Sequence, residues 1–171
     1  TNDVATISAN SDLANVFASG GTVSAWIYPT SWGGGGFGRI VDKTITGFTG
    51  GWTIYVDNSS LRFGHEFSTQ NGRWTTAASA LSLNQWQHVV AVFDSDSAAN
   101  VPTLYIDGSP VAVSVSMSAS GTDPDDSATD ILIGDASWAS RVFGGVLDEI
   151  RIYNRSLSAS EVSALYTATA P

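Results

Sequence analysis

One stretch of the 171-residue chain decides the fold, and it reads Phe143-Gly-Gly-Val-Leu-Asp-Glu-Ile-Arg-Ile-Tyr-Asn-Arg-Ser-Leu-Ser-Ala-Ser-Glu-Val-Ser-Ala-Leu-Tyr166. Its first half alternates in character with a period of two residues, as a half-buried β-strand does. The alternation predicts one face with Leu147, Glu149, Arg151 and Tyr153, and an opposite face with Asp148, Ile150 and Ile152. We therefore predict a strand over residues 146–153.

The second half of this stretch carries the signals of a helix start. Ser158 is placed to act as the N-cap, with Glu161 three residues later as its capping-box partner. Leu157 and Val162 occupy the two positions of a hydrophobic staple. The two signals agree, and they predict a short C-terminal helix.

Short runs with a β-branched and aromatic bias recur along the whole chain, separated by Gly, Asn, Asp and Ser turns. The predicted strands are Val4–Ala9, Thr22–Tyr28, Arg39–Lys43, Trp52–Asp57, Leu61–Phe67, Arg73–Ala77, Trp86–Phe93, Thr103–Ile106, Val111–Ser116, Ile131–Ile133 and Val146–Tyr153. Because Trp86–Phe93 is apolar on both faces, it should be an interior strand. We predict an all-β fold, an antiparallel two-sheet β-sandwich with one short C-terminal helix.

The stretch that begins at Phe143 resembles the closing segment of laminin-G-like, concanavalin A-like jelly-roll domains. In these domains a Gly-x-(Leu/Ile)-Asp-Glu-(Val/Ile)-Arg-(Ile/Val)-Tyr strand precedes Asn-Arg-x-Leu-Ser and a short helix. Three further stretches are similar to family strands in the same order: Thr22-Val-Ser-Ala-Trp-Ile-Tyr-Pro29, Asn84-Gln-Trp-Gln-His-Val-Val-Ala-Val-Phe-Asp94 and Leu104-Tyr-Ile-Asp-Gly108. The resemblance implies a single jelly-roll domain over residues 1–171. It does not select a function, because such folds host sugar binders, adhesins and hydrolases.

Composition narrows the classes of partner. Seven basic and sixteen acidic residues give a formal net charge of −9, so we expect a nucleic acid to be repelled. No apolar run approaches the roughly 20 residues that a membrane span needs. The chain has no cysteine and one lysine, and it is rich in Ser, Thr and Gly. Such a surface is typical of an extracellular or surface-displayed protein, and we expect a mature or excised domain.

Catalysis finds little support in the sequence. Hydrolysis of a glycosidic bond normally uses two carboxylates about 5 Å apart or wider, and the chain has only the glutamates Glu66, Glu149 and Glu161. Related family 16 glycoside hydrolases carry a Glu-x-Asp-x-x-Glu strand motif, which this sequence does not contain. We therefore expect a protein that is not an enzyme. The enzymatic alternative pairs Glu66, beside His65, with an aspartate; the simpler interpretation is an exposed charged pair at a strand edge.

Calcium is the metal that the resemblance implies, bound by hard oxygen ligands. Asp148 resembles the aspartate at which many jelly-roll relatives bind a structural calcium together with groups from the first strand region. In this chain that region offers Asn10 and Asp12. The alternative is that Asp148 caps a strand or pairs with an arginine. Two acidic loops, residues 94–100 and 123–130, are rival sites, with solvated turns as their alternative interpretation.

Sugar recognition uses a flat apolar surface with a few oriented hydrogen-bonding groups, and the chain has six tryptophans. Three of them occupy predicted loop or strand-edge positions and are candidate stacking platforms: Trp32, Trp74 and Trp138. Arg73 and Arg141 lie close by in sequence, where a guanidinium can bond hydroxyls or pair with a uronate or sulfate group. Trp26 and Trp86 are assigned to packing and Trp52 to either role. Burial under long loops is the alternative for all three candidates.

The sequence thus favours a non-catalytic, lectin-like carbohydrate-binding module that recognises an extracellular polysaccharide or glycan by aromatic stacking, with a structural calcium. The alternative from another class is a structural or adhesive surface, fibre or virion decoration domain. Its Trp and Gly loops would contact other copies of the chain or a larger parent protein.

Overall fold

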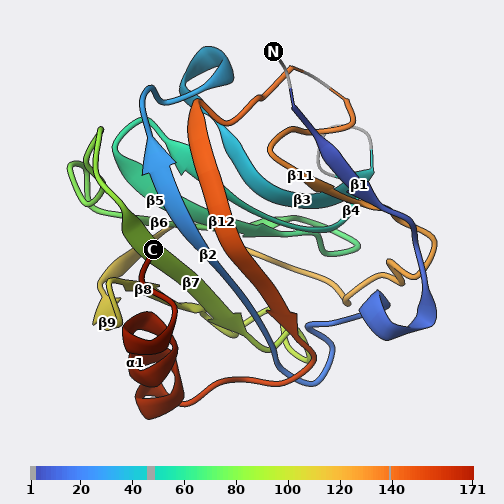
Figure 1. Cartoon of the computed structure of the whole chain (residues 1–171). Helices are drawn as coiled ribbons and strands as arrows, with labels where there is room; N and C mark the ends of the chain where they lie inside the picture. Colours follow the sequence, from blue (N-terminus) through green and yellow to red (C-terminus); the bar gives the residue numbers. More distant parts are fainter. Residues whose placement is uncertain (1–2, 46–48, 139) are drawn as a thin grey trace.

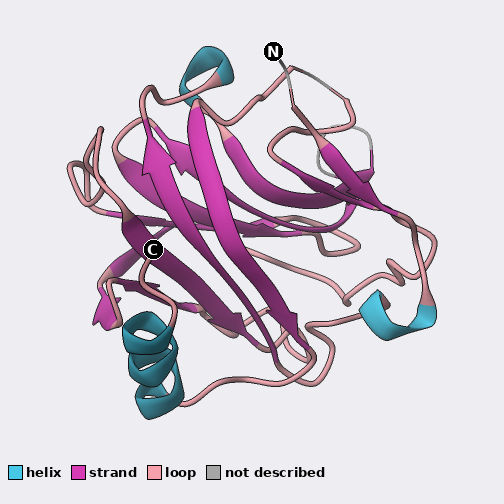
Figure 2. Ribbon diagram, viewed as in Figure 1, coloured by secondary structure: helices cyan, strands magenta, loops and turns pink. Residues whose placement is uncertain are grey.

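A computed structural model of the chain describes residues 3–45, 49–138 and 140–171. The described strands form two antiparallel sheets packed face to face (Figure 1, Figure 2). The first sheet has seven strands, in the spatial order β1 (Ala5–Ile7), β11 (Ile131–Ile133), β3 (Arg39–Ile45), β4 (Thr49–Asp57), β5 (Ser60–His65), β6 (Gly72–Thr76) and β10 (Val113–Met117). The second has five, in the order β12 (Gly145–Tyr153), β2 (Gly21–Pro29), β7 (Gln87–Phe93), β8 (Thr103–Ile106) and β9 (Ser109–Val111). The predicted antiparallel β-sandwich is confirmed.

An apolar core fills the space between the two sheets. Phe17 lies at its centre and packs edge-on against Trp52, with ring centroids 5.0 Å apart. On β4 the side chains of Ile54 and Val56 belong to this core, whereas Tyr55 between them does not. Since side chains alternate along a strand, Tyr55 points to the outer face of the seven-stranded sheet. That outer face carries the candidate site described below.

The helix α1 (Ala159–Ala168) packs on the outside of the five-stranded sheet (Figure 1). Leu157 and Val162 share a buried cluster with Val90 of β7, as the predicted staple requires. The predicted capping box is also confirmed, because Ser158 Oγ accepts from the Glu161 N–H and Glu161 Oε2 accepts from the Ser158 N–H. Two short 3-10 helices lie in loops: η1 (Ser11–Leu13) and η2 (Gly34–Gly36). No helix in the described ranges is long and apolar enough to cross a membrane.

The alternation predicted for residues 146–153 is wrong in its middle. The pairing of β12 with β2 shifts register between Asp148 and Arg151, and Glu149 has a positive φ of 48°. A bulge of this kind inserts a residue and reverses the side to which the following side chains point. Leu147 and Ile150, predicted on opposite faces, therefore both pack against the core between the sheets.

Two predictions about neighbouring strands have different outcomes. The predicted strand Val111–Ser116 is two strands, β9 and β10, which belong to different sheets and leave Ala112 between them. The chain thus crosses from one sheet to the other where the sequence pattern is continuous. The prediction of an interior strand is confirmed, since β7 lies between β2 and β8 and is covered by the core on one face and by α1 on the other.

Candidate functional site

A cleft of about 240 Å³ lies on the outer face of the seven-stranded sheet. Three of its residues form a row across neighbouring strands, because Arg39 of β3 pairs with Tyr55 of β4, and Tyr55 pairs with Arg62 of β5. Arg39 and Tyr55 are buried and form the floor. The remaining lining residues are partly exposed and form the rim: Phe37, Arg73, Trp138 and Arg141.

Two loops form the wall of the cleft beyond the strands. Arg141 Nη1 donates to the carbonyl oxygen of Gly34 at 3.2 Å, and the Arg141 guanidinium lies 5.2 Å from the ring centroid of Phe37. The backbone N–H of Arg141 donates to Asp135 Oδ1 at 2.6 Å. A Cβ atom on Gly34 would come within 2.6 Å of the Ser140 carbonyl oxygen, so this close approach of the two loops requires glycine. The glycine run is thus a packed loop that holds Arg141 in place.

Trp138 presents its ring at the same wall. Its Nε1–H donates to Thr44 Oγ1 at 3.3 Å, which fixes the orientation of the indole. The ring centroid lies 5.7 Å from the Arg39 guanidinium and 5.9 Å from that of Arg141. The Arg39 guanidinium also lies 4.1 Å from the ring centroid of Tyr55. These separations are within the range of cation–π attraction, so aromatic rings and guanidinium groups form one continuous surface.

Two carboxylates balance part of the positive charge at the cleft. Arg39 Nε donates to Asp42 Oδ2 at 3.0 Å, and both side chains are buried. Arg62 Nη2 lies 2.7 Å from Asp57 Oδ2 in a partly exposed pair. The guanidinium groups of the cleft therefore outnumber the two carboxylates with which they form these pairs.

The interpretation of His65 and Glu66 as an exposed pair is wrong, because each residue is only 2% exposed. Burial raises the pKa of Glu66 to about 8; Arg73 lowers this pKa and Asp42 adds to the rise. Burial also lowers the pKa of His65 to about 4, although its ring contacts the Glu66 carbonyl oxygen. Near neutral pH both groups are therefore mainly uncharged, and Glu66 adds little negative charge to the cleft.

The structure brings together three of the five residues that the sequence predicts for sugar binding: Arg73, Trp138 and Arg141. Trp32 lies in the glycine loop but is half-buried against the core, and it does not line the cleft. Its part in binding stays a prediction.

Trp74 is not the exposed platform that its predicted loop or strand-edge position suggested. Its side chain is 2% exposed, and its ring stacks on Phe63 at 6.2 Å and lies 5.1 Å from Phe93. Trp74 follows Arg73 in β6, and the alternation of the strand directs Arg73 to the outer face and Trp74 into the core. The structure therefore removes Trp74 from the set of accessible rings.

Sequence reasoning missed the residues that the strands bring to the cleft, Arg39, Tyr55 and Arg62. A signal existed, because Tyr55 and Arg62 each stand between two apolar residues of a predicted strand and so mark its outward face. The signal does not say which outward positions of different strands become neighbours, since that depends on strand order and register.

Two of the predicted calcium ligands make local hydrogen bonds in the structure. Asp148 is exposed on β12, where its Oδ1 accepts from the Glu149 N–H at 2.8 Å. The Asn10 side-chain oxygen caps η1 by accepting from the N–H groups of Asp12 and Leu13. Over residues 3–45, 49–138 and 140–171, no hydrogen bond or ion pair joins Asp148 to Asn10 or Asp12, and no group of three or more His, Asp and Glu side chains is arranged to hold a metal. Calcium binding by Asp148, Asn10 and Asp12 therefore stays a prediction from the sequence.

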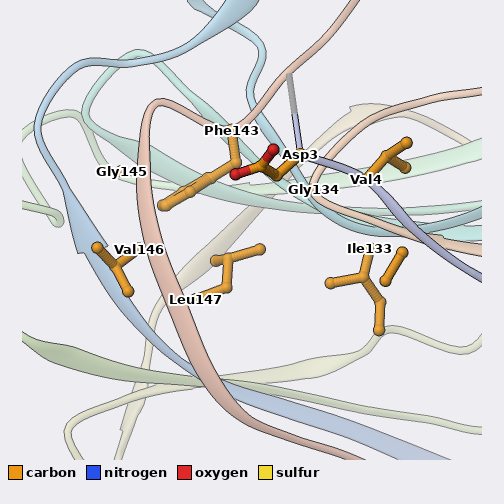
Figure 3. A pocket seen from close by; sticks show the side chains of 9 residues that line it. Asp3, Val4, Ile133, Gly134, Phe143, Gly145, Val146 and Leu147 are labelled. Carbon is orange, nitrogen blue, oxygen red and sulfur yellow. The ribbon is translucent and has the colours of Figure 1, made fainter. Parts of the chain in front are cut away.

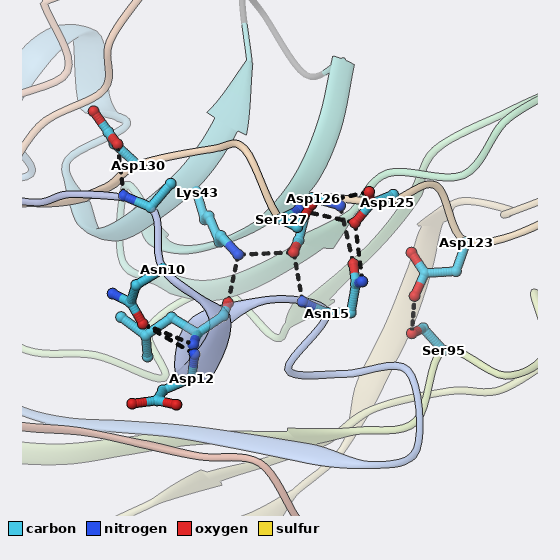
Figure 4. Close-up of polar contacts among 12 residues, drawn as sticks. Asn10, Asp12, Asn15, Lys43, Ser95, Asp123, Asp125, Asp126, Ser127 and Asp130 are labelled. Atoms are coloured by element: carbon cyan, nitrogen blue, oxygen red, sulfur yellow. Dashed lines mark hydrogen bonds and ion pairs between the residues drawn. The ribbon is translucent and has the colours of Figure 1, made fainter.

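The acidic loop 123–130 instead contacts the ammonium group of Lys43 (Figure 4). Lys43 Nζ lies 2.7 Å from Asp126 Oδ1 and 2.5 Å from the Leu13 carbonyl oxygen. Asn15 and Asp126 exchange two hydrogen bonds, each from the backbone N–H of one to the side-chain oxygen of the other. A buried cation of the chain itself thus joins this loop to β3 and to the N-terminal segment.

A larger pocket of about 630 Å³ lies between the edge strands β1 and β12 (Figure 3). Its lining combines apolar side chains with polar backbone groups and consists of Asp3, Val4, Ala5, Ile133, Gly134, Phe143, Gly145, Val146 and Leu147. Among these residues Asp3 alone has a polar side chain. The pocket therefore offers few polar side chains, and no aromatic ring besides Phe143, to orient a sugar.

The two-sheet sandwich with a cleft on the outer face of one sheet places the chain in the class of jelly-roll domains. A family model described as the concanavalin A-like lectin/glucanases superfamily matches residues 1–163, and the chain belongs to this family. Comparison with curated proteins found no match.

Several solved structures share the fold. The botulinum neurotoxin serotype D binding domain has a TM-score of 0.69 and 17% identity, covering 98% of this chain and 41% of that one. The binding domain of botulinum neurotoxin DC in complex with SialylT has a TM-score of 0.61 and 14% identity, and the match covers 90% of this chain and 36% of that one. The same domain in complex with rat synaptotagmin II has a TM-score of 0.61 and 14% identity, and the match covers 90% of this chain and 37% of that one. The chain thus spans about two fifths of the length of these structures, and the likeness shows the fold.

Proposed function

We propose that the chain is a non-catalytic carbohydrate-binding module, extracellular or surface-displayed, whose binding site is the cleft on the outer face of the seven-stranded sheet. The observation that carries the proposal is the position of the Trp138 ring beside the partly exposed guanidinium group of Arg141, above the buried guanidinium of Arg39. An aromatic ring packs against the C–H face of a sugar, and guanidinium groups donate to its hydroxyls. The cleft offers both kinds of contact from one wall.

The comparisons support binding of a glycan or a protein. The family is named for lectins as well as glucanases, and one structural neighbour is a binding domain in complex with SialylT. At 240 Å³ the cleft is smaller than the roughly 300–1,000 Å³ of sites for drug-sized ligands. A terminal sugar unit or a branch fits it better than an extended polysaccharide chain.

The acidic groups near the cleft support binding without turnover. Asp42 is fully buried, and its carboxylate accepts from Arg39 Nε and from the backbone N–H and hydroxyl of Thr44. Glu66, an acidic group that interacts with Arg73 and Asp42, is 2% exposed. A glycosidase places two carboxyl groups on either side of the scissile bond, and these two are not accessible to a substrate.

The alternative function is an adhesive module that contacts protein. The pocket between β1 and β12 favours it, because the apolar side chains of Val4 and Val146 at its rim are 47% and 52% exposed. A structural neighbour in complex with rat synaptotagmin II also supports it. Under this alternative, substitutions at the rim of the pocket would weaken binding and substitutions in the cleft would not.

A glycan array followed by calorimetric titration of each hit tests the proposal. Trp138→Ala should abolish or greatly weaken binding. Trp86→Ala is the matched control, because Trp86 is also partly exposed but packs against Tyr28 on the five-stranded sheet, away from the cleft. Equal loss in the two variants, or no glycan bound at all, would contradict the proposed site.

A further inference from the structure

The positive charge of the chain is concentrated at one place. The whole chain has seven lysines and arginines and a net charge of −9. Four of these seven basic residues line the 240 Å³ cleft: Arg39, Arg62, Arg73 and Arg141. A sugar with only neutral hydroxyls does not need four guanidinium groups, since amide and hydroxyl side chains bond hydroxyls equally well. The concentration of arginine indicates that the ligand carries negative charge.

The charge balance of the cleft agrees with an anionic ligand. Asp42 pairs with Arg39 and Asp57 with Arg62, whereas the described side-chain hydrogen bond of Arg141 goes to a backbone carbonyl and not to a carboxylate. The nearby carboxylate of Asp135 accepts from the backbone N–H groups of Ala136 and Arg141. The cleft is therefore a small positive region on an acidic protein.

Two of the arginines retain hydrogen-bonding capacity on different sides of the cleft. Arg62 comes from β5 and is partly exposed, and its described ion pair with Asp57 uses only Nη2. Arg141 comes from the facing loop, and its described side-chain hydrogen bond uses only Nη1, toward Gly34. A guanidinium presents several N–H donors in a planar fork, which matches the two oxygens of a carboxylate or a sulfate. An acidic group between them could accept from both.

The rest of the lining selects an acidic sugar rather than a free ion or a long polyanion. Phe37 and Trp138 supply apolar ring surface, which a bare anion does not use. A highly charged polymer would be repelled by the net charge of the protein as a whole. The small volume also limits the ligand to about one sugar unit.

We propose that the cleft binds an anionic sugar unit, one that carries a carboxylate or a sulfate. Arg62 and Arg141 donate hydrogen bonds to the acidic group, and the indole of Trp138 packs against the sugar ring. This inference rests on the proposed function and adds the chemical class of its ligand. The role given to the two arginines is recognition of charge, and the role of the tryptophan is recognition of the sugar.

The test compares ligands that differ only in charge, with the wild-type protein. The probes are a disaccharide ending in glucuronic acid, its methyl ester, a sulfated disaccharide on the same backbone and the neutral glucose counterpart. Calorimetric titration at low and at 0.5 M salt should show that the acid or the sulfate binds about tenfold or more tightly than the ester and the neutral sugar. Added salt should remove most of this preference. Comparison of the acid with the sulfate identifies which acidic group is preferred.

Variants locate the contact. Arg62→Gln and Arg141→Gln should each lose most of the preference for acid over ester, while Arg151→Gln should keep it, because Arg151 pairs with Glu149 on β12 away from the cleft. Circular dichroism melts check that each variant folds. The comparison of acid with ester uses the wild-type protein, so it does not depend on the folding of a variant.

The outcomes separate the inference from the function on which it rests. Equal binding of acid, ester and neutral sugar would overturn the anionic class and leave sugar binding in place. Binding of none of them, together with a silent glycan array, would overturn both. An acid preference that both arginine variants retain, or acetate or inorganic sulfate binding as tightly as the saccharide, would also overturn the inference.

Discussion

The ammonium nitrogen of Lys43 lies 2.7 Å from Oδ1 of Asp126, and the two side chains are only 1% and 5% exposed. The same carboxylate oxygen accepts from the backbone N–H of Asn15, and the ammonium also donates to the Leu13 carbonyl oxygen. The single lysine of the chain therefore connects three segments that are distant in sequence. Its contribution is structural, since none of these residues lines the cleft.

Removing this cation should destabilise the fold. Lys43→Met leaves the Asp126 carboxylate buried without a charged partner, for which we expect a loss of about 3–5 kcal/mol in the free energy of unfolding. Urea denaturation of the wild type and of Lys43→Met measures this loss. Arg151→Gln serves as the control, because its pair with Glu149 is about 40% exposed and should contribute about 0–1 kcal/mol. Similar losses in the two variants would contradict the structural role of Lys43.

The two tryptophans that the sequence grouped together should behave differently. Trp74→Ala opens a cavity beside Phe63 and Phe93, so we expect the free energy of unfolding to fall by about 3–5 kcal/mol. Trp138→Ala removes a partly exposed ring and should cost much less stability while it removes ligand binding. Thermal melts and titrations of both variants check this contrast. A stable Trp74→Ala protein that has lost binding would place Trp74 in the site instead.

Burial of Glu66 should make stability fall as pH rises. The pKa of this carboxyl is raised from 4.5 to about 8 in the folded protein, with Arg73 and Asp42 as the charged groups that affect it. Below pH 4.5 the group is protonated in both states; between pH 4.5 and 8 the unfolded chain loses the proton first, so folding becomes less favourable. The free energy of unfolding should therefore fall between pH 5 and pH 9 in the wild type. In Glu66→Gln this fall should be smaller by about 2–4 kcal/mol. Parallel stability curves in urea titrations at these pH values would refute this effect.

The same carboxyl should tune the affinity for an acidic ligand. Above about pH 8 Glu66 ionises beside Arg73 and reduces the positive charge of the cleft. We expect the affinity for an acidic saccharide to fall between pH 7 and pH 9.5 in the wild type and to change less in Glu66→Gln. Calorimetric titrations at the two pH values measure the difference, and the methyl ester, which carries no charge, is the control ligand.

Calcium binding at Asp148, with Asn10 and Asp12, stays a prediction from the sequence. A calcium ion bound only by the folded state would stabilise it by about 2.7 kcal/mol at 100 times the dissociation constant. The melting temperature should then rise in excess calcium relative to chelator, and Asp148→Asn should remove the rise. Identical melting temperatures of the wild type in the two conditions would remove the prediction.

Local signals in the sequence predicted local structure well. The capping box of Ser158 and Glu161 depends on four consecutive residues and is present as predicted. The strand pattern around Tyr55 likewise depends on neighbours in sequence. Errors arose where a backbone irregularity interrupts a pattern. The bulge at Glu149 reverses the faces of β12, and the change of sheet at Ala112 divides a run that reads as one strand.

The candidate site was predicted only in part for a related reason. Arg73, Trp138 and Arg141 were identified from residue type and sequence neighbourhood. Arg39 and Arg62 reach the same cleft only through the pairing of β3, β4 and β5, and pairing between strands is a property of the assembled sheet. Trp74 was misplaced because a one-residue difference along a strand decides between the core and the outer face.

The measurement that tests the proposed site most directly is a ¹H–¹⁵N NMR titration of the indole N–H signals with a saccharide retained on the glycan array. Six tryptophans give six such signals, each assigned by single substitution. We expect a large shift for Trp138, whose ring lines the cleft and whose Nε1–H donates to Thr44, and no shift for Trp86, which precedes β7 and packs against Tyr28 of the other sheet. A saccharide that binds and leaves the Trp138 signal unchanged would contradict the account.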